Sequence, residues 1–273
     1  MRPAISQVCS LNWPFQRDVE DFAAGKCGAL EVWLTKLETY LEKHSTGDLE
    51  RLLADQEMSA PVASFQGGLL TSQGEHRKEA WDHFRRRLGL CRQVGITTLV
   101  VACDIAQPLE QQDIARAQVS LRQAAQEAGR RDMRLALEFQ ARAALGSNLQ
   151  TAAALVADVG SPHLGICLDA FHYYTGPSKL EDLAYLEKHN LFHVQLCDLA
   201  DTPREFAADS DRILPGDGEI NLGPIIERLK EIGYEGLVSL ELMNPQLWQV
   251  PPLQLGEIGM TALRKVLGLA AME

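Results

Sequence analysis

The sequence contains no CxxC pair, the spacing that is typical of zinc ribbons and of thiol redox sites. Several of its cysteines lie inside apolar, strand-like runs, where a thiol usually behaves as a small hydrophobic group. We therefore expect free thiols, no disulfide bonds and a reducing, cytoplasmic compartment. The six cysteines are Cys9, Cys27, Cys91, Cys103, Cys167 and Cys197.

Long hydrophobic runs are absent as well. No window approaches the roughly 18 uninterrupted apolar residues that a membrane-spanning helix requires. The N-terminal stretch MRPAISQVCSLNW has no basic region followed by a long apolar segment, which is the pattern of a secretory signal. We expect a protein that neither spans a membrane nor is secreted by that route.

Positive charge is scarce, with 26 Lys and Arg against 37 Asp and Glu and a formal net charge of −11. Nucleic acids and anionic membranes are bound through clusters of Lys and Arg, so this balance disfavours both kinds of partner. A small substrate, neutral or locally neutralised, fits the composition better.

No Pro-, Ser- or Gly-rich linker divides the 273 residues, so we expect one domain over residues 1–273. Short apolar runs alternate with longer segments of helical periodicity, which is typical of a parallel sheet with helices outside it. The predicted strands are 5–11, 29–34, 60–65, 98–103, 134–139, 164–169, 191–197 and 236–242, and the clearest helices are 75–94, 113–130, 148–159, 179–189 and 223–232.

Helix-boundary residues agree with this reading. Asn148 and Ser178 are good N-caps, and Glu181 completes a predicted capping box with Ser178. Eight strand–helix units at about 34 residues each match the size of a (β/α)₈ TIM barrel of roughly 250 residues. A doubly wound open sheet is the alternative. Predicted helix ends fall at Gly95, Gly160 and Gly233.

Polar residues recur at one parity near the ends of four predicted strands. In LALEF, Glu138 shares a face with Ala136, opposite three bulky apolar residues. Asp169 in GICLD, Gln195 in HVQLC and Glu241 in GLVSLEL repeat this arrangement. Because the carboxyl ends of barrel strands meet at one face, we expect these four side chains to converge there.

Three converging buried carboxylates would repel one another unless a cation neutralised them. Together with the oxygen of an amide they form a hard ligand set, which favours Mn²⁺ or Mg²⁺, with Co²⁺ as a third candidate, over Zn²⁺. Any one of the acids taken alone could equally be an N-cap or an ion-pair partner. The set of four therefore predicts a single divalent-metal site.

With these motifs the chain resembles the sugar phosphate isomerase/epimerase family of xylose isomerase-like barrels, which includes ketose 3-epimerases, inosose dehydratases and endonuclease IV. The resemblance covers nearly the whole chain. Its motifs are LALEF, CLDAFH, HVQLCD, VSLELMNPQLW and the run SDRILPGDGEINLGPIIERLKEIGYEG.

The resemblance implies that Glu138, Asp169, Gln195 and Glu241 are the metal ligands. It also places a substrate-contacting histidine at His172 and a substrate-binding arginine at Arg212, just before ILPGDG. One departure matters, because the third ligand is most often His in this family. Gln at position 195 resembles some 3-dehydroshikimate dehydratases of the same superfamily.

Several reactions are compatible with such a site. A metal bound to a carbonyl and its neighbouring hydroxyl acidifies the intervening C–H bond, so an enediolate can form. We expect Glu138 and Glu241 to move the proton, with His172 polarising the carbonyl or acting as a base. Ligation alone is the alternative role for the two glutamates, and filling space near the site is the alternative for the histidine.

Other residues have more ordinary interpretations. His193 is expected to be buried and hydrogen-bonded behind the ligands, and Asp198 to order the loop that follows its strand. PGDG, at 215–218, lacks the Gly-Lys-Ser/Thr of a phosphate-binding loop and predicts a turn. The tryptophans Trp13, Trp33 and Trp248 follow three of the predicted strands and could stack on a sugar or simply pack.

The sequence thus favours a metal-dependent isomerase or epimerase of a ketose or related keto-sugar. A lyase that dehydrates a keto-cyclitol, 3-dehydroshikimate or a 3-keto-glycoside is the alternative, and Gln195 favours it. A sugar-binding subunit without turnover is a non-enzymatic alternative. Endonuclease chemistry is disfavoured by the acidic charge and the few suitable histidines, and a homo-oligomer remains open.

Overall fold

The computed structural model describes residues 1–269, which group into two compact units. The first unit comprises Met1–Pro61 and Val194–Glu273, and the second comprises Val62–His193. The strand order is that of a closed barrel, β1-β10-β7-β6-β5-β4-β3-β2. This order confirms the predicted barrel over the doubly wound sheet, whereas the single domain remains a prediction.

In the first unit, strand β1 pairs in parallel with β2 on one side and β10 on the other, and β10 pairs with β7. A two-stranded antiparallel ribbon, β8 with β9, follows β7. The elements are β1 (Arg2–Ser6), η1 (Gln7–Ser10), α1 (Phe15–Ala24), β2 (Ala29–Trp33), α2 (Leu34–Leu41), α3 (Thr46–Asp55), β8 (Asp198–Leu199), η3 (Asp209–Asp211), β9 (Arg212–Ile213), α8 (Gly223–Glu231), β10 (Leu237–Leu240), η4 (Leu247–Gln249) and α9 (Pro252–Leu267).

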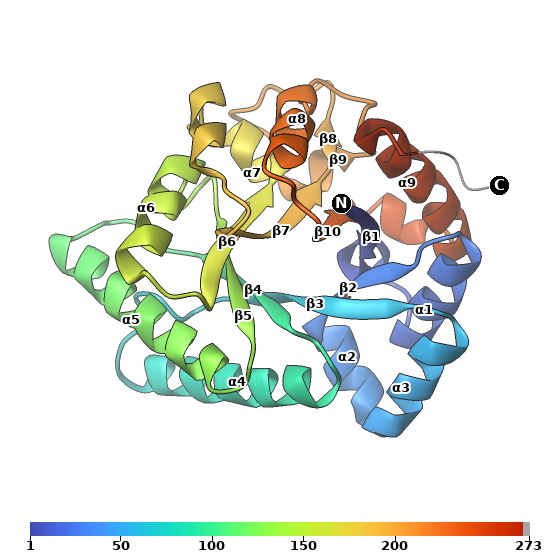
Figure 1. Ribbon diagram of the computed structural model, residues 1–273, viewed down its shortest axis with the longest axis horizontal. Helices are drawn as coiled ribbons and strands as arrows, with labels where there is room; N and C mark the ends of the chain where they lie inside the picture. Colours follow the sequence, from blue (N-terminus) through green and yellow to red (C-terminus); the bar gives the residue numbers. More distant parts are fainter. Residues whose placement is uncertain (270–273) are drawn as a thin grey trace. The chain divides into compact units, whose positions relative to one another are not determined.

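In the second unit, strands β3 to β6 pair in parallel in sequence order, and Figure 1 shows α4, α5 and α6 along the outer side of these strands. The elements are β3 (Ser59–Gln66), α4 (Gly74–Gln93), β4 (Thr98–Cys103), α5 (Gln111–Gly129), β5 (Arg134–Phe139), α6 (Leu149–Val159), β6 (Leu164–Asp169), α7 (Ala170–Thr175) and η2 (Leu180–Tyr185). Strands β3 and β7 (Leu191–Leu196) each include the point where one unit gives way to the other.

Strand β5 shows how the sequence pattern builds the core. Leu135, Leu137 and Phe139 are fully buried on one side of the strand, and each contributes about 1.5–3 kcal/mol through burial. Ala136 and Glu138 take the other side, where the small alanine leaves room for the acid. The two sides of β5 therefore carry the residues that the sequence alternation predicts for them.

Three sequence expectations about boundaries are wrong. Strand 5–11 ends at Ser6, because Gln7–Ser10 forms a 3₁₀ turn in which the Ser10 hydroxyl donates to the carbonyl of Gln7 at 3.3 Å. Helix 179–189 is only the 3₁₀ turn Leu180–Tyr185, started by Asp182, which accepts from the backbone N–H of Lys179 at 2.8 Å. The Ser178–Glu181 capping box is absent, since the Ser178 hydroxyl accepts from the N–H of Leu149 at 3.1 Å.

Other boundary signals are confirmed. Asn148 caps α6 by accepting from the N–H of Thr151 at 2.8 Å, and Gly160 ends this helix with φ of 62°. Glycine adopts this left-handed conformation more readily than residues with a Cβ, which is why it suits the end of the helix. The six cysteines are buried, as expected for thiols that behave as small hydrophobic groups.

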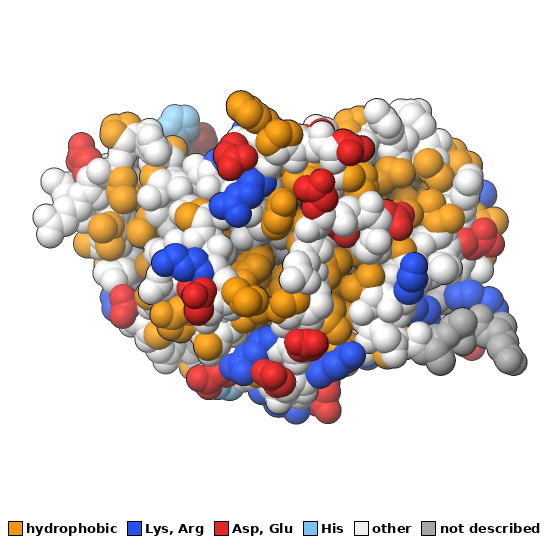
Figure 2. All heavy atoms as spheres, turned by 90° about the horizontal axis from the view of Figure 1, so that it is seen from above, with side chains coloured by type: hydrophobic (Ala, Val, Ile, Leu, Met, Phe, Trp, Pro, Cys, Tyr) orange, Lys and Arg blue, Asp and Glu red, His pale blue; other side chains and the backbone are white. Residues whose placement is uncertain are grey.

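Within residues 1–269, no helix combines the length and the apolar character needed to cross a bilayer. Figure 2 shows acidic and basic side chains interspersed with apolar ones on one face of the described residues.

Candidate metal centre

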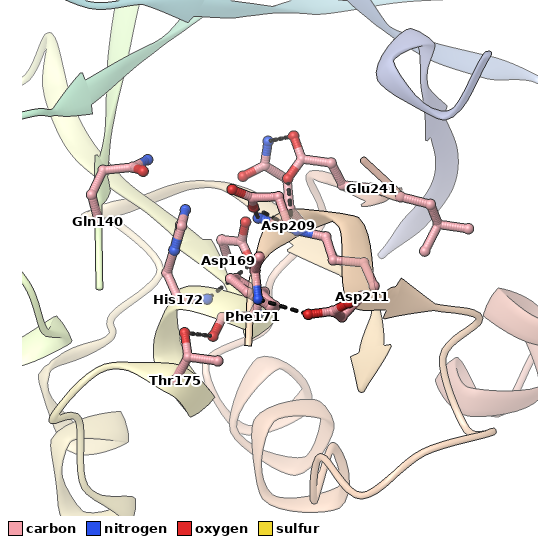
Figure 3. A network of polar contacts seen from close by, with 12 residues as sticks. Gln140, Asp169, Phe171, His172, Thr175, Asp209, Asp211 and Glu241 are labelled. Carbon is pink, nitrogen blue, oxygen red and sulfur yellow. Dashed lines mark hydrogen bonds and ion pairs between the residues drawn. The ribbon is translucent and has the colours of Figure 1, made fainter. Parts of the chain in front are cut away.

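Three buried side chains of the second unit meet after strands β5 and β6. Glu138 pairs in register with Cys167, and Asp169 lies two residues beyond Cys167, so both acids share one face of the sheet. Potential ligand atoms of Glu138, Asp169 and His172 all lie within 4.8 Å of one another. Their exposed fractions are only 6%, 0% and 7%. Figure 3 shows His172 beside Asp169.

The backbone of α7 holds Asp169 in place. Its Oδ1 accepts from the N–H of Phe171 at 2.6 Å and from the N–H of His172 at 3.3 Å, so Asp169 is the N-cap of this helix. The helix in turn positions His172 three residues later. The N-cap role weighed for an isolated acid is therefore real here, and it occupies one oxygen of the carboxylate.

Glu138 has a side-chain partner of its own. The amide Nε2 of Gln140 donates to Glu138 Oε2 at 2.7 Å. A cation held by Glu138, Asp169 and His172 would have two oxygen donors and one imidazole nitrogen. This mixed set widens the choice of metal beyond the hard ions that the sequence favoured, because imidazole also suits Zn²⁺.

A second group lies in the first unit. Ser6 pairs in register with Glu31, while Ala4 pairs with Ser239, which pairs with Gln195. Residues paired in a parallel sheet point to the same side, and positions two apart do so as well. Glu31, Gln195 and Glu241 therefore project from one face of β2, β7 and the end of β10.

Hydrogen bonds join these residues into a chain. Gln195 Nε2 donates to Glu31 Oε1 at 2.9 Å and to Glu241 Oε1 at 2.8 Å. Arg212 Nη1 donates to Glu241 Oε2 at 2.8 Å, and its Nη2 contacts Asp209 Oδ1 at 2.7 Å. Figure 3 shows the end of this chain near Glu241 and Asp209. Arg212 is only 1% exposed, so its ion pairs with Glu241 and Asp209 are made by a buried guanidinium.

Glu31 is a buried polar residue that the sequence pattern had not singled out. It is fully buried in β2, within the segment ALEVW, whose alternation of small, apolar and acidic residues resembles that of LALEF. Glu138 shares one side of its strand with a small residue, Ala136, and Glu31 shares one side of residues 29–34 with Ala29 in the same way. This alternation is the signal by which Glu31 could have been found.

The composition of both groups fits a divalent cation. In the second unit, two carboxylates and an imidazole lie within reach of one ion. In the first unit, the buried acids Glu31 and Glu241 both accept from Gln195, and Glu241 also contacts the guanidinium of Arg212. Uncompensated buried charge is costly, so a bound cation would stabilise either arrangement. The fully buried Ser6 hydroxyl, which has no hydrogen-bond partner among residues 1–269, adds a polar atom beside Glu31.

The three tryptophans that were predicted to stack on a sugar or to pack have different surroundings. Trp13 and Trp33 line a cavity of about 710 Å³ in the first unit, together with Tyr40 and Lys36. Trp248 does not border this cavity, and its Nε1 donates to the carbonyl of Val8 at 2.7 Å. Trp248 is therefore anchored to the turn after β1, and its contact with a substrate stays a prediction.

Lys36 belongs to a buried ion pair at the edge of that cavity. Its Nζ contacts Asp18 Oδ2 at 2.6 Å, and Gln7 Nε2 donates to the same oxygen at 3.0 Å. Burial raises the pKa of Asp18 to about 6, against the opposing effect of Lys36. Burial likewise lowers the pKa of Lys36.

Asp198 has the loop-ordering role that was predicted. Its carboxylate accepts from the N–H groups of Leu199 at 2.9 Å, Gly216 at 2.9 Å and Ile220 at 2.8 Å. The PGDG segment is a turn, with Gly216 at φ of 92°. His193 is fully buried, as expected.

Comparison with known proteins places the chain in a family. The family model of the xylose isomerase-like TIM barrel matches residues 23–266. The chain belongs to this family, which confirms the resemblance read from its motifs and the predicted barrel fold.

Individual relatives differ in name and in coverage. An inosose isomerase of Bacillus velezensis is 28% identical, over 80% of this chain and 79% of that protein. A 3-dehydroshikimate dehydratase of Pseudomonas putida is 26% identical, over 96% of this chain and 41% of that protein. A structure of the IOLI protein with a bound zinc atom aligns over 100% of both chains, with a TM-score of 0.92 and 22% identity. Matches to four inosose isomerases cover between 34% and 79% of those relatives' lengths.

Proposed function

We propose that this chain is a metal-dependent isomerase or epimerase that acts on a keto-sugar or keto-cyclitol. The observation that carries the proposal is the buried group of Glu138, Asp169 and His172, whose ligand atoms lie within 4.8 Å of one another. Membership of the xylose isomerase-like family and the relatives named inosose isomerase support this choice.

We propose one ion, Mn²⁺ or Mg²⁺, with Glu138, Asp169, Gln195 and Glu241 as its ligands. These are the residues that match the family motif, and each is buried near the end of a strand. Zn²⁺ is the main rival, because His172 adds a nitrogen donor and the IOLI structure contains zinc. A cytoplasmic location and a homo-oligomer belong to the same proposal.

The bound ion would polarise a substrate carbonyl and acidify the neighbouring C–H bond. In this mechanism Glu241 removes the proton, and Glu138 returns a proton to the opposite side of the carbon. The guanidinium of Arg212, at 2.8 Å from Glu241 Oε2, fixes the direction of that carboxylate and presents a positive charge to an oxyanion on the substrate. His172 donates a hydrogen bond to the carbonyl.

A lyase reaction is the second candidate, and two observations favour it. Gln195 stands where the family most often has His, and a dehydratase relative aligns over 96% of this chain. In this reaction His172 removes the proton, and the enolate formed expels a β-hydroxyl group. The two candidates therefore share the loss of the proton and differ in the fate of the enolate.

The test combines metal content by mass spectrometry with exchange of substrate C–H for deuterium in D₂O. A ketose panel and a keto-cyclitol panel are compared for the wild type, Glu241→Gln and the exposed control Glu50→Gln. We expect bound metal and exchange in the wild type and the control, with exchange lost in Glu241→Gln. Product analysis then separates an epimer or isomer from a dehydrated product. Absence of both metal and exchange would leave the sugar-binding subunit.

A further inference from the structure

We propose that Glu31 is a positioning residue that sets the orientation of the Gln195 amide, so that Oε1 faces the metal ion. The inference rests on the proposed metal site and adds to it a residue outside the ligand set. Glu31 is fully buried in β2 and contacts Gln195 at 2.9 Å.

The chemistry of the contacts dictates which end of the amide is which. Carboxylates only accept hydrogen bonds, so the amide nitrogen rather than the oxygen must face Glu31 and Glu241. Nε2 carries two hydrogens, and its two contacts with these acids are 2.9 Å and 2.8 Å long. The coordinating atom of this side chain is therefore Oε1, on the other arm of the amide.

An amide is a poor metal ligand unless its orientation is fixed. Rotation by half a turn about the last bond would replace Oε1 with an NH₂ group, which has no lone pair to offer a cation. With one carboxylate partner the amide can still swing about that contact, whereas two partners on the same nitrogen hold it. Glu31 thus does for Gln195 what a carboxylate partner does for a metal-bound imidazole.

Packing alone does not account for an acid at this position. A buried carboxylate costs free energy, and an apolar residue would fill the same space in β2 without that penalty. Glu31 and Glu241 both accept from the one amide nitrogen of Gln195, so two acids converge on this amide. Retaining an acid there is understandable if its hydrogen bond to Gln195 serves a bound cation.

The test measures the Mn²⁺ dissociation constant of the chelator-treated full chain by titration calorimetry, for three substitutions of Glu31. Glu31→Leu removes the acceptor and should raise the dissociation constant about 10- to 100-fold. Glu31→Asp keeps the charge but shortens the side chain, and should weaken binding in the same direction. Glu31→Gln can still accept from Gln195 through its own Oε1. Because the acceptor is kept, we expect no more than about a threefold change, whereas loss of an outer-shell partner costs about tenfold or more.

A second background decides whether Glu31 acts through Gln195. The Gln195→Ala variant and the double variant Gln195→Ala/Glu31→Leu should have the same Mn²⁺ dissociation constant, because the amide that Glu31 orients is absent from both. A tenfold further loss in that background would overturn the inference and make Glu31 a direct or purely electrostatic contributor. Equal effects of Glu31→Gln and Glu31→Leu would overturn it as well.

Unfolding in urea, measured without metal, separates folding from binding. If Glu31→Leu does not fold, the comparison of Glu31→Asp with Glu31→Gln still decides the question. A wild type that binds Mn²⁺ while all Glu31 variants bind equally well refutes the positioning role alone. A wild type that binds no divalent metal refutes the proposed metal site and this inference together.

Discussion

The polar groups of the two units are held in different ways. In the second unit, Asp169 is fixed by backbone N–H groups at the start of α7. In the first unit, Gln195 and Glu241 are fixed by other side chains, in a chain that runs from Glu31 to Arg212. A backbone donor stays in place when neighbouring residues change, whereas every member of a side-chain network depends on the others.

This difference predicts how substitutions should behave in each unit. Changes near Asp169 should remain local, because the helix cap survives any replacement that keeps an acceptor. Changes in the first unit should spread along the network and combine non-additively, because removing one partner leaves another charge buried and unpaired.

The largest effect on metal binding is expected for Asp169→Asn. Asparagine is as good an N-cap as aspartate, so α7 should keep its start and the free energy of unfolding should change by less than about 1 kcal/mol. The charge that faces the cation is lost, and we expect the Mn²⁺ dissociation constant to rise at least about 100-fold, beyond the range for residues behind the ligands.

Asp169→Ala is the matched comparison, since it removes the cap as well and should cost a further 0.5–2 kcal/mol or so in urea unfolding. Metal titration and urea unfolding together separate the two functions of this side chain. Undiminished metal affinity in Asp169→Asn would show that Asp169 is only a helix cap.

The largest effect on stability is expected in the first unit, for Arg212→Met. Removing the guanidinium leaves Glu241 buried without its charge partner, and breaking such a pair costs about 3–5 kcal/mol. The exposed Arg204→Met serves as the control and should change stability by less than about 0.5 kcal/mol. In an Arg212→Met background, Glu241→Gln should recover part of the loss. Simple addition of the two losses in urea unfolding would contradict the network.

Asp198 provides an intermediate case, since its side chain accepts from the backbone N–H groups of three residues. Asp198→Ala leaves these three N–H groups without this acceptor, at a cost of about 3 kcal/mol in the free energy of unfolding. Asp198→Asn keeps one acceptor oxygen and should lose less than half as much. Equal losses for the two variants would show that charge, rather than hydrogen bonding, holds the PGDG turn.

The sequence predicted the parts of this molecule that depend on local pattern. Parity alone placed Glu138 on the same face as Ala136, and the register confirms that face. The Gln195–Glu31 contact joins residues 164 positions apart, and no local signal encodes such a pairing. The short β1 was mispredicted for a related reason, since the Gln7–Ser10 turn is accompanied by contacts with Asp18 and Lys36.

The smallest effect concerns the Asp18–Lys36 pair, a side-chain network of the first unit that titrates in an accessible range. The pKa of Asp18 is raised from 3.8 to about 6, chiefly by burial. The folded protein therefore binds this proton more tightly than the unfolded chain does. The contribution of Asp18 to stability is fully present below about pH 3.8 and is lost as the pH rises through about 6.

We expect the free energy of unfolding of the wild type, relative to Asp18→Asn, to fall by about 2–3 kcal/mol between pH 4 and pH 6. Urea unfolding of both proteins at several pH values measures this difference, and groups that titrate equally in both cancel. The same comparison for Asp48→Asn, a partly exposed capping residue whose pKa is lowered by hydrogen bonds from Ser45, should show no fall over that window. If the difference in the free energy of unfolding between the wild type and Asp18→Asn does not change with pH, the folded and unfolded states bind the proton equally. The Asp18–Lys36 network would then, like the helix cap at Asp169, be held independently of its charges.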